Sequence, residues 1–216
     1  MKRFAVLGLV LGLGLRAPAA AAASDPPWSV ESAQSVGAGS NVVWGQVGFP
    51  GLWAEFIHGT DGLTEIGAKF GFDYALQGVV SSCCHPGLDL QFLLRTKLFD
   101  NGKIRIAGSF DPGVLLHFPG STQFGITFPL AVEFGFPVSS VVSLNASFDL
   151  PMYVLFSDGG NSGYFAIPIL FGGGAEYLLD PNVALTFKLK LGPTIVTGGG
   201  QAQFTLYAMF GAAYKF

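Results

Sequence analysis

Two sets of residues combine the side-chain types that catalysis or metal binding requires. The first is Cys83-Cys84-His85, two thiols followed by an imidazole. Adjacent cysteines alone cannot occupy two corners of a good tetrahedral zinc site, and the usual ligand spacings are missing. In the oxidising compartment argued for below, such thiols pair with each other or with another chain. We therefore expect a disulfide at Cys83 and Cys84, and neither a metal ion nor another cofactor.

The second set is Ser109, Asp111 and His117, the residue types of a hydrolytic triad. Their spacing argues against catalysis, because positions 109 and 117 lie roughly 26 Å apart on an extended strand. That distance is far beyond hydrogen-bond reach. The glycine run 172–174 precedes no helix that would bind a phosphate. We expect no enzymatic activity from this chain.

Composition limits the class of protein. Of the 216 residues, 50% are hydrophobic and only 12% are charged, about half the usual charged share of a globular domain. A conventional water-soluble domain is therefore not expected. The formal net charge is −3, and no long basic run exists to neutralise phosphates, so we expect no nucleic-acid partner.

The N-terminus has the order of an export signal. Lys2 and Arg3 precede an apolar run (4–15), and a stretch of small residues (19–23) follows it. The run is shorter than the ~20 apolar residues that a membrane-spanning helix needs. We expect residues 1–23 to be a signal peptide, and no helical membrane anchor elsewhere.

The apolar residues of the remaining chain alternate with a period of two, which is the period of a β-strand. In the stretch 123–136, one row is aromatic or aliphatic and the other is small, polar or charged. The apolar row is Phe124, Ile126, Phe128, Leu130, Val132, Phe134 and Phe136, and the opposite row is Gln123, Gly125, Thr127, Pro129, Ala131, Glu133 and Gly135. Such a segment is a strand with one apolar face.

Ten segments follow this pattern, separated by turn sequences such as Asp100-Asn101-Gly102 and Asp180-Pro181-Asn182. We find no pattern of a helix, a linker or a second domain. The predicted strands are Asn41–Phe49, Leu52–His58, Leu63–Ala75, Leu88–Phe99, Lys103–His117, Phe124–Phe136, Val141–Phe156, Tyr164–Leu178, Val183–Val196 and Phe204–Lys215.

Every charge within the second to tenth predicted strands lies opposite the apolar row. These charges are Glu55, Glu65, Lys69, Asp73, Asp89, Arg95, Lys97, Arg105, Asp111, Glu133, Asp149, Glu176, Lys188, Lys190 and Lys215. A soluble barrel would put the apolar row inside, and a membrane barrel would put it outside. Side-chain size favours the membrane barrel, because the neutral residues beside the charges are mostly Gly, Ala, Ser and Thr, as a narrow lumen requires.

Backbone groups without partners are intolerable in hydrocarbon, so the strands must close on themselves. We predict an all-β fold, a closed antiparallel up-and-down transmembrane β-barrel of ten strands, with eight strands as the alternative.

The last predicted strand ends on an aromatic face that includes Tyr214 and Phe216. With the export signal and the alternating pattern, this face makes the chain from residue 41 onward resemble small bacterial outer-membrane β-barrel proteins. That group includes porin-like barrels and the outer-membrane protein W or opacity-type superfamily, which these residues do not separate. The resemblance implies a Gram-negative outer membrane, a surrounding lipid bilayer, and recognition of Tyr214 and Phe216 by the barrel-assembly machinery. It divides the chain into a signal peptide (1–23), an N-terminal periplasmic segment (24–40) and a barrel (41–216).

Ordering the inward charges by height predicts an acidic mouth and a mixed-charge plug at the periplasmic base. The mouth consists of Asp73, Asp89, Asp111 and Asp149, with no Lys or Arg among them, and the plug consists of Glu65, Lys97, Arg105, Glu133, Glu176 and Lys215. A ring of one sign concentrates counter-ions, so conduction should favour cations. Arg105 is best placed to pair with Glu133.

Five prolines fall at one height in successive strands: Pro112, Pro129, Pro151, Pro168 and Pro193. Because proline cannot donate to a strand ladder, this belt marks either a rim that flares above the bilayer or a lateral opening between strands. The predicted function is a narrow pore or a transporter for small or apolar solutes. The alternative is a structural or adhesive surface barrel with a closed lumen. The sequence does not identify a solute.

Overall fold

The computed structural model describes residues 27–156, 163–197 and 202–216, so the predicted signal peptide lies outside the described residues. The strands are β1 (Asn41–Phe49), β2 (Gly51–Gly59), β3 (Thr64–Ala75), β4 (Cys83–Asp100), β5 (Arg105–Phe110), β6 (Gly113–His117), β7 (Gln123–Pro137), β8 (Val142–Phe156), β9 (Gly163–Pro168), β10 (Leu170–Leu178), β11 (Val183–Val196) and β12 (Gln203–Lys215). Two short 3-10 helices, η1 (Leu76–Gly78) and η2 (Val80–Ser82), connect β3 to β4.

In the part of the chain that the structure describes, no helix is long and apolar enough to cross a membrane.

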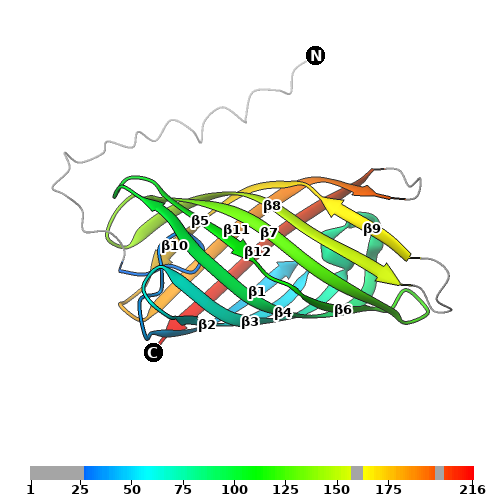
Figure 1. Ribbon diagram of the computed structural model, residues 1–216, viewed down its shortest axis with the longest axis horizontal. Helices are drawn as coiled ribbons and strands as arrows, with labels where there is room; N and C mark the ends of the chain where they lie inside the picture. Colours follow the sequence, from blue (N-terminus) through cyan, green and yellow to red (C-terminus); the bar gives the residue numbers. More distant parts are fainter. Residues whose placement is uncertain (1–26, 157–162, 198–201) are drawn as a thin grey trace, which may run out of the picture.

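The strands pair antiparallel around a closed wall, in which β1 completes the ring by pairing with β12. β5 and β6 share one place between β4 and β7, and β9 and β10 share the place between β8 and β11. The twelve segments therefore form a barrel of 10 strands (Figure 1). The prediction of ten strands is confirmed, and the alternative of eight is wrong.

Proline accompanies both interruptions of the wall. β5 ends before Asp111-Pro112, and β9 ends at Pro168. Pro129 lies directly opposite Pro151 in the neighbouring strand. Since none of these prolines has an N–H to donate, the ladder loses rungs at one height. The belt predicted from the sequence is therefore a discontinuity of the hydrogen-bond ladder.

The outer surface stays aromatic between the belt and the loops. The rings of Phe124 and Phe156 stack with centroids 6.4 Å apart, and those of Phe128 and Phe165 stack at 5.9 Å. An apolar outer surface on both sides of the belt favours a position within the membrane-facing band over a flared rim. The lateral opening between strands stays a prediction.

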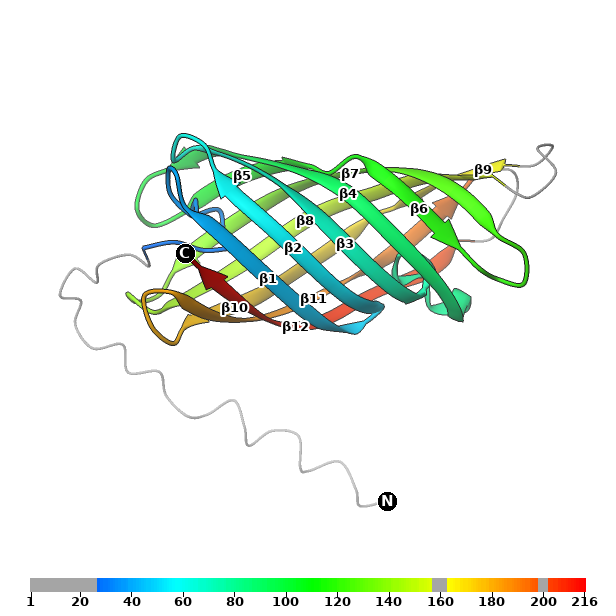
Figure 2. The ribbon, with the colours of Figure 1, turned by 90° about the horizontal axis from the view of Figure 1, so that it is seen from below.

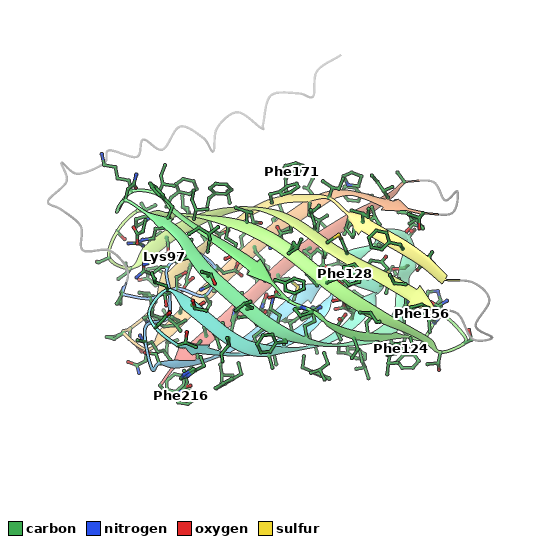
Figure 3. All side chains as sticks on the ribbon, in the orientation of Figure 1. Lys97, Phe124, Phe128, Phe156, Phe171 and Phe216 are labelled. Carbon is green, nitrogen blue, oxygen red and sulfur yellow. The ribbon has the colours of Figure 1, made fainter. Side chains whose placement is uncertain are left out.

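The two faces of the wall differ as the alternation predicts. Large apolar side chains point outward, and Leu130 and Phe171 are 42% and 62% exposed; Figure 3 shows Phe124 and Phe171 directed away from the barrel. Inside, Glu65 and Glu176 are at most 2% exposed. Because hydrocarbon solvates the apolar row and the lumen retains the charges, this is the fold of an outer-membrane β-barrel.

Both ends of the described chain lie at the same end of the barrel, which we call the terminal end (Figure 2). Its turns cover 60–63, 101–104, 138–141 and 179–182. In the first of these turns, Asp61 accepts the backbone N–H groups of Thr64 and Leu63 at 2.7 and 2.9 Å. These bonds hold the pKa of Asp61 below its usual value. We call the opposite end, which carries η1 and η2, the loop end.

The facing of the wall predicts different costs for the same substitution on its two sides. Leu130→Arg, near the middle of β7, should impair membrane insertion by about 2–4 kcal/mol, because the charge would face hydrocarbon. Ser109→Arg on the neighbouring strand β5 faces the lumen cavity and should cost much less. The measurement is the denaturant dependence of folding into lipid vesicles, and equal costs at the two positions would contradict the assignment of the faces.

Candidate functional site: a lumen filled from both ends

The N-terminal segment enters the lumen at the terminal end, and we call residues 27–36 the plug. Trp28, Val30 and Val36 are at most 3% exposed and belong to an apolar cluster with residues of the wall. The Trp28 Nε1 donates a hydrogen bond of 2.7 Å to the carbonyl oxygen of Pro181. The segment that we expected only to precede the barrel therefore fills the terminal end of its lumen.

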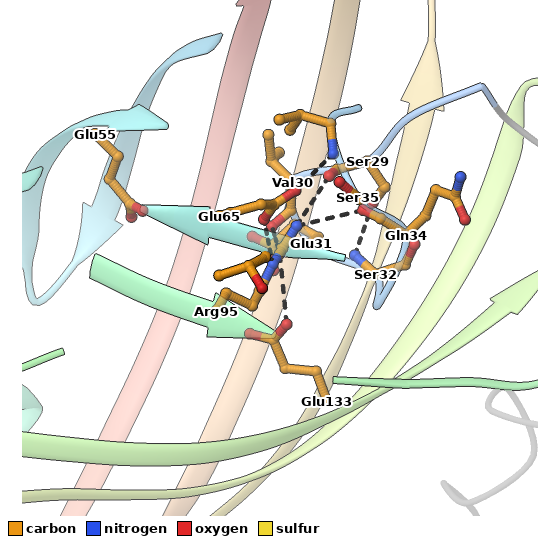
Figure 4. A network of polar contacts seen from close by, with 12 residues as sticks. Ser29, Val30, Glu31, Ser32, Gln34, Ser35, Glu55, Glu65, Arg95 and Glu133 are labelled. Carbon is orange, nitrogen blue, oxygen red and sulfur yellow. Dashed lines mark hydrogen bonds and ion pairs between the residues drawn. The ribbon is translucent and has the colours of Figure 1, made fainter. Parts of the chain in front are cut away.

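Three buried charged side chains of the wall bind the plug through its backbone. Figure 4 shows two of them, Arg95 and Glu65. Arg95 on β4 donates to the carbonyl oxygens of Val30 at 2.6 Å, Ser29 at 3.1 Å and Gln34 at 3.3 Å. Glu65 on β3 accepts the backbone N–H of Val36. Arg95 is thus hydrogen-bonded to three carbonyls of one short segment.

Glu176 on β10 completes this set from the other side of the lumen. Its carboxylate accepts the Ser29 hydroxyl at 2.6 Å and the backbone N–H groups of Val30 and Glu31 at 3.2 and 3.1 Å. Backbone groups taken out of water need such partners, since each unpaired one costs roughly 1–3 kcal/mol. The wall charges thus satisfy the polar groups of a segment that has no strand partner.

Arg95 also joins two of the predicted plug carboxylates. Its Nε lies 2.7 Å from Glu65 Oε2, and its Nη1 lies 3.5 Å from Glu133 Oε2. The sequence analysis placed Arg95 on the inward row but did not include it among the six wall charges predicted to form a plug. The signal was available, because Glu65 and Arg95 are direct partners in the register of β3 and β4.

The remaining predicted plug residues lie at the same end of the barrel. Lys97 and Arg105 each approach Asp100 to 3.3 Å. Lys215 lies over the Trp28 ring, 5.9 Å from its centroid. The predicted base of mixed charge therefore exists around an inserted peptide segment that the sequence analysis had left outside the lumen.

A cavity of about 130 Å³ lies above the plug, between Val30 and Glu31 on one side and Gln77 and Tyr207 on the other. At the roughly 10–15 Å³ of accessible space that one water molecule needs, the cavity holds on the order of ten waters or a small organic solute. Its lining contains both polar and apolar side chains. The lining includes Trp44, Trp53, Glu55, Ile57, Lys69, Gln91, Leu93, Arg95, Asp111, Glu133, Asp149, Leu170, Lys188, Lys190 and Met209.

The expectation of a mouth without cations is wrong for two of its four aspartates. Lys69 forms an ion pair with Asp111, and Lys190 lies 2.6 Å from Asp149. These lysines come from strands distant in sequence, β3 and β11, and the register brings them to the height of the aspartates. Asp111 and Asp149 therefore belong to neutralised pairs in the cavity wall.

The other two mouth residues, Asp73 and Asp89, lie closer to the loop end and are 3% and 4% exposed. Asp89 accepts hydrogen bonds from the side-chain amides of Gln77 and Gln91. Gln77 comes from η1, where a left-handed backbone (φ 45°) accompanies this inward contact. The connection between β3 and β4 thus folds over the lumen.

An apolar cluster closes the lumen beside this connection, and we call it the cap. It consists of Leu76, Leu115, Tyr153, Leu155 and Ala166. Val79 adds a β-bridge to Thr205 on β12. The sequence predicted small inward residues throughout, so these large side chains were missed, although their position in the inward row was visible. The lumen is therefore filled at the loop end as well as at the terminal end.

Cys83 and Cys84 are both exposed and unbonded, with their Sγ atoms 2.9 Å apart. The structure does not contain the expected bond between Cys83 and Cys84, and pairing with another chain stays a prediction. The two cysteines begin strand β4. His117 is buried, 6.1 Å from His85 between ring centroids. No group of three or more His, Cys, Asp or Glu side chains within the described ranges is arranged to hold a metal ion.

Comparison with known proteins finds a likeness among solved structures and none among known sequence families. No protein-family model and no curated protein matches the sequence. Among solved structures, the chain is similar to a loop-deletion mutant of OmpT, an outer membrane protein of Vibrio cholerae, with 15% identity and a TM-score of 0.37. The match covers 83% of this chain and 60% of that one.

The plug contacts predict that Arg95 contributes far more to stability than the neighbouring, less buried Lys97. Arg95→Met should lower the free energy of unfolding by about 3–5 kcal/mol, because it leaves Glu65 without its buried partner. It should also increase hydrogen exchange of residues 27–36, measured by mass spectrometry. Lys97→Met breaks a pair whose side chains are 19% and 28% exposed, and it should cost under about 1 kcal/mol. Similar costs for both variants, or an unchanged exchange of the plug, would contradict this role.

Proposed function

We propose that this protein is a gated passage for small solutes across the outer membrane, and that the structure describes its closed state. The observation that carries the proposal is the separation of wall and plug. All 10 strands complete their ring without residues 27–36, and a charged cavity lies behind those residues. A segment that contributes no strand can leave while the backbone ladder of the wall stays paired.

The chemistry of the plug contacts supports reversible release. Arg95, Glu65 and Glu176 bind backbone groups, and water offers the same groups equivalent hydrogen bonds once the lumen is hydrated. Release of the plug still exposes the apolar cluster around Trp28 and Val36 to water, which opposes opening. Because water replaces the hydrogen bonds and only this apolar burial is lost, a minor open state can exist in equilibrium with the closed one.

The proposal also fixes the orientation. The terminal end faces the periplasm, where an exported chain would leave both termini, and the loop end faces outward. Tyr214 and Phe216, 53% and 58% exposed with stacked rings, would serve the barrel-assembly machinery at the periplasmic rim. Export would rest on the signal peptide predicted over residues 1–23. The plug is then reached from the periplasm.

Removing the plug tests the proposal. In planar bilayers, the full chain should show rare or no openings. A variant that lacks residues 27–36 and carries Leu115→Ala and Tyr153→Ala in the cap should conduct steadily, because both filled ends of the lumen are then open. Heat-modifiable gel mobility of both proteins serves as the control for a folded barrel. A synthetic peptide of residues 27–36 should restore closure, since most of its polar contacts are made through the backbone. Folded proteins without conductance in either form would instead support the structural or adhesive barrel.

A further inference from the structure

Glu31 is the one charged residue of the plug, and it belongs to the lining of the cavity. Its Oε1 lies 3.5 Å from the Nζ of Lys188 on β11. Residue Glu31 is 8% exposed, so the plug brings a buried carboxylate to the edge of the cavity.

Lys188 differs from the other lysines of the cavity in where its partner comes from. Lys69 and Lys190 pair with aspartates of the wall, Asp111 and Asp149. For Lys188, the carboxylate in ion-pair range within the described residues is that of Glu31 in the plug. Lys188 also lies over the ring of Trp44, 4.5 Å from its centroid. When the plug leaves, the wall keeps a cation on an aromatic face without its carboxylate.

The pair between Glu31 and Lys188 is loose. Its 3.5 Å separation is longer than the 2.7–2.9 Å of a good ammonium–carboxylate hydrogen bond. The same oxygen is buried and makes no hydrogen bond to any described residue. The carboxylate of a free solute can therefore approach Lys188 more closely than the Glu31 carboxylate, whose position the plug backbone restricts.

We propose that Lys188 and Trp44 form a subsite for the carboxylate of a small organic solute, and that Glu31 occupies it in the closed state. The inference rests on the proposed gated passage and names its solute class. The adjoining lining of Ile57, Leu93 and Met209 suits a short apolar tail, and the cavity of about 130 Å³ limits that tail to a few carbons. Solute and plug then compete for one cation, so solute binding favours the open state.

Equilibrium binding of radiolabelled butyrate to the full chain in detergent micelles tests the subsite. Glu31→Gln should tighten binding roughly five- to tenfold, because it removes the internal competitor while keeping the plug backbone. Adding Lys188→Met to that variant should abolish the gain. The matched control is Asp100→Asn, which removes a carboxylate 3.3 Å from Lys97 outside the lining of the cavity and should leave butyrate binding unchanged. Butylamine and butanol should not bind better to Glu31→Gln than to the unmodified chain.

A folding defect is distinguished by heat-modifiable mobility and by the thermal midpoint, which butyrate should raise in Glu31→Gln. Equal butyrate affinity in the unmodified chain and Glu31→Gln, or a gain that survives Lys188→Met, would overturn the subsite. If deletion of residues 27–36 together with the cap substitutions gives conductance while Glu31→Gln gives no gain, the passage stands and the carboxylate subsite is wrong. If butyrate binds as expected but that deletion variant does not conduct, the subsite stands and the passage is wrong.

Discussion

A β-wall in hydrocarbon has no water to satisfy its backbone, so its first and last strands must meet, and here β12 pairs with β1 over eight residue pairs from Val42–Lys215 to Phe49–Ala208. Closure decides the rest of the molecule. It fixes one apolar row against lipid and confines every inward charge to a narrow lumen. The properties of this protein are therefore set by how those confined charges find partners.

Most of these charged side chains form ion pairs with other side chains of the wall, on strands that lie far apart in the sequence. Lys69 with Asp111, and Lys190 with Asp149, are such pairs. The guanidinium of Arg95 has five N–H donors in a fixed fork. The neighbouring carboxylates accept only some of them. The carbonyl groups of the plug use the remaining donors. A peptide segment without regular structure thus has a defined place because a buried cation needs acceptors.

The alternation of residues was enough to predict the number of strands, their approximate bounds and the face each presents, because a period of two leaves only one assignment per strand. Partners across the lumen were harder to predict. The pair of Glu65 and Arg95 depends on the register of β3 and β4, which alternation alone does not give. Residues 27–36 have no alternation at all, so their entry into the lumen left no periodic signal. The sequence analysis also missed the roles of Gln77 and Tyr153. These residues close the lumen through tertiary contacts of the connection between β3 and β4 and of the cap, and such contacts leave no periodic pattern in the sequence.

The proline belt shows how the same wall tolerates a local loss of closure. The register on either side, Asp149 with Leu170 and Tyr153 with Ala166, places Pro151 opposite Pro168, where neither residue has an N–H to donate. On the outer surface next to this gap, the ring of Phe128 on β7 stacks on that of Phe165 on β9, reaching across β8. Aromatic contact, favoured where lipid surrounds both rings, thus bridges strands at the height where backbone hydrogen bonds are missing. Pro129 and Pro151 also line the cavity, so the least hydrogen-bonded level of the wall is the level at which the lumen has room for a solute.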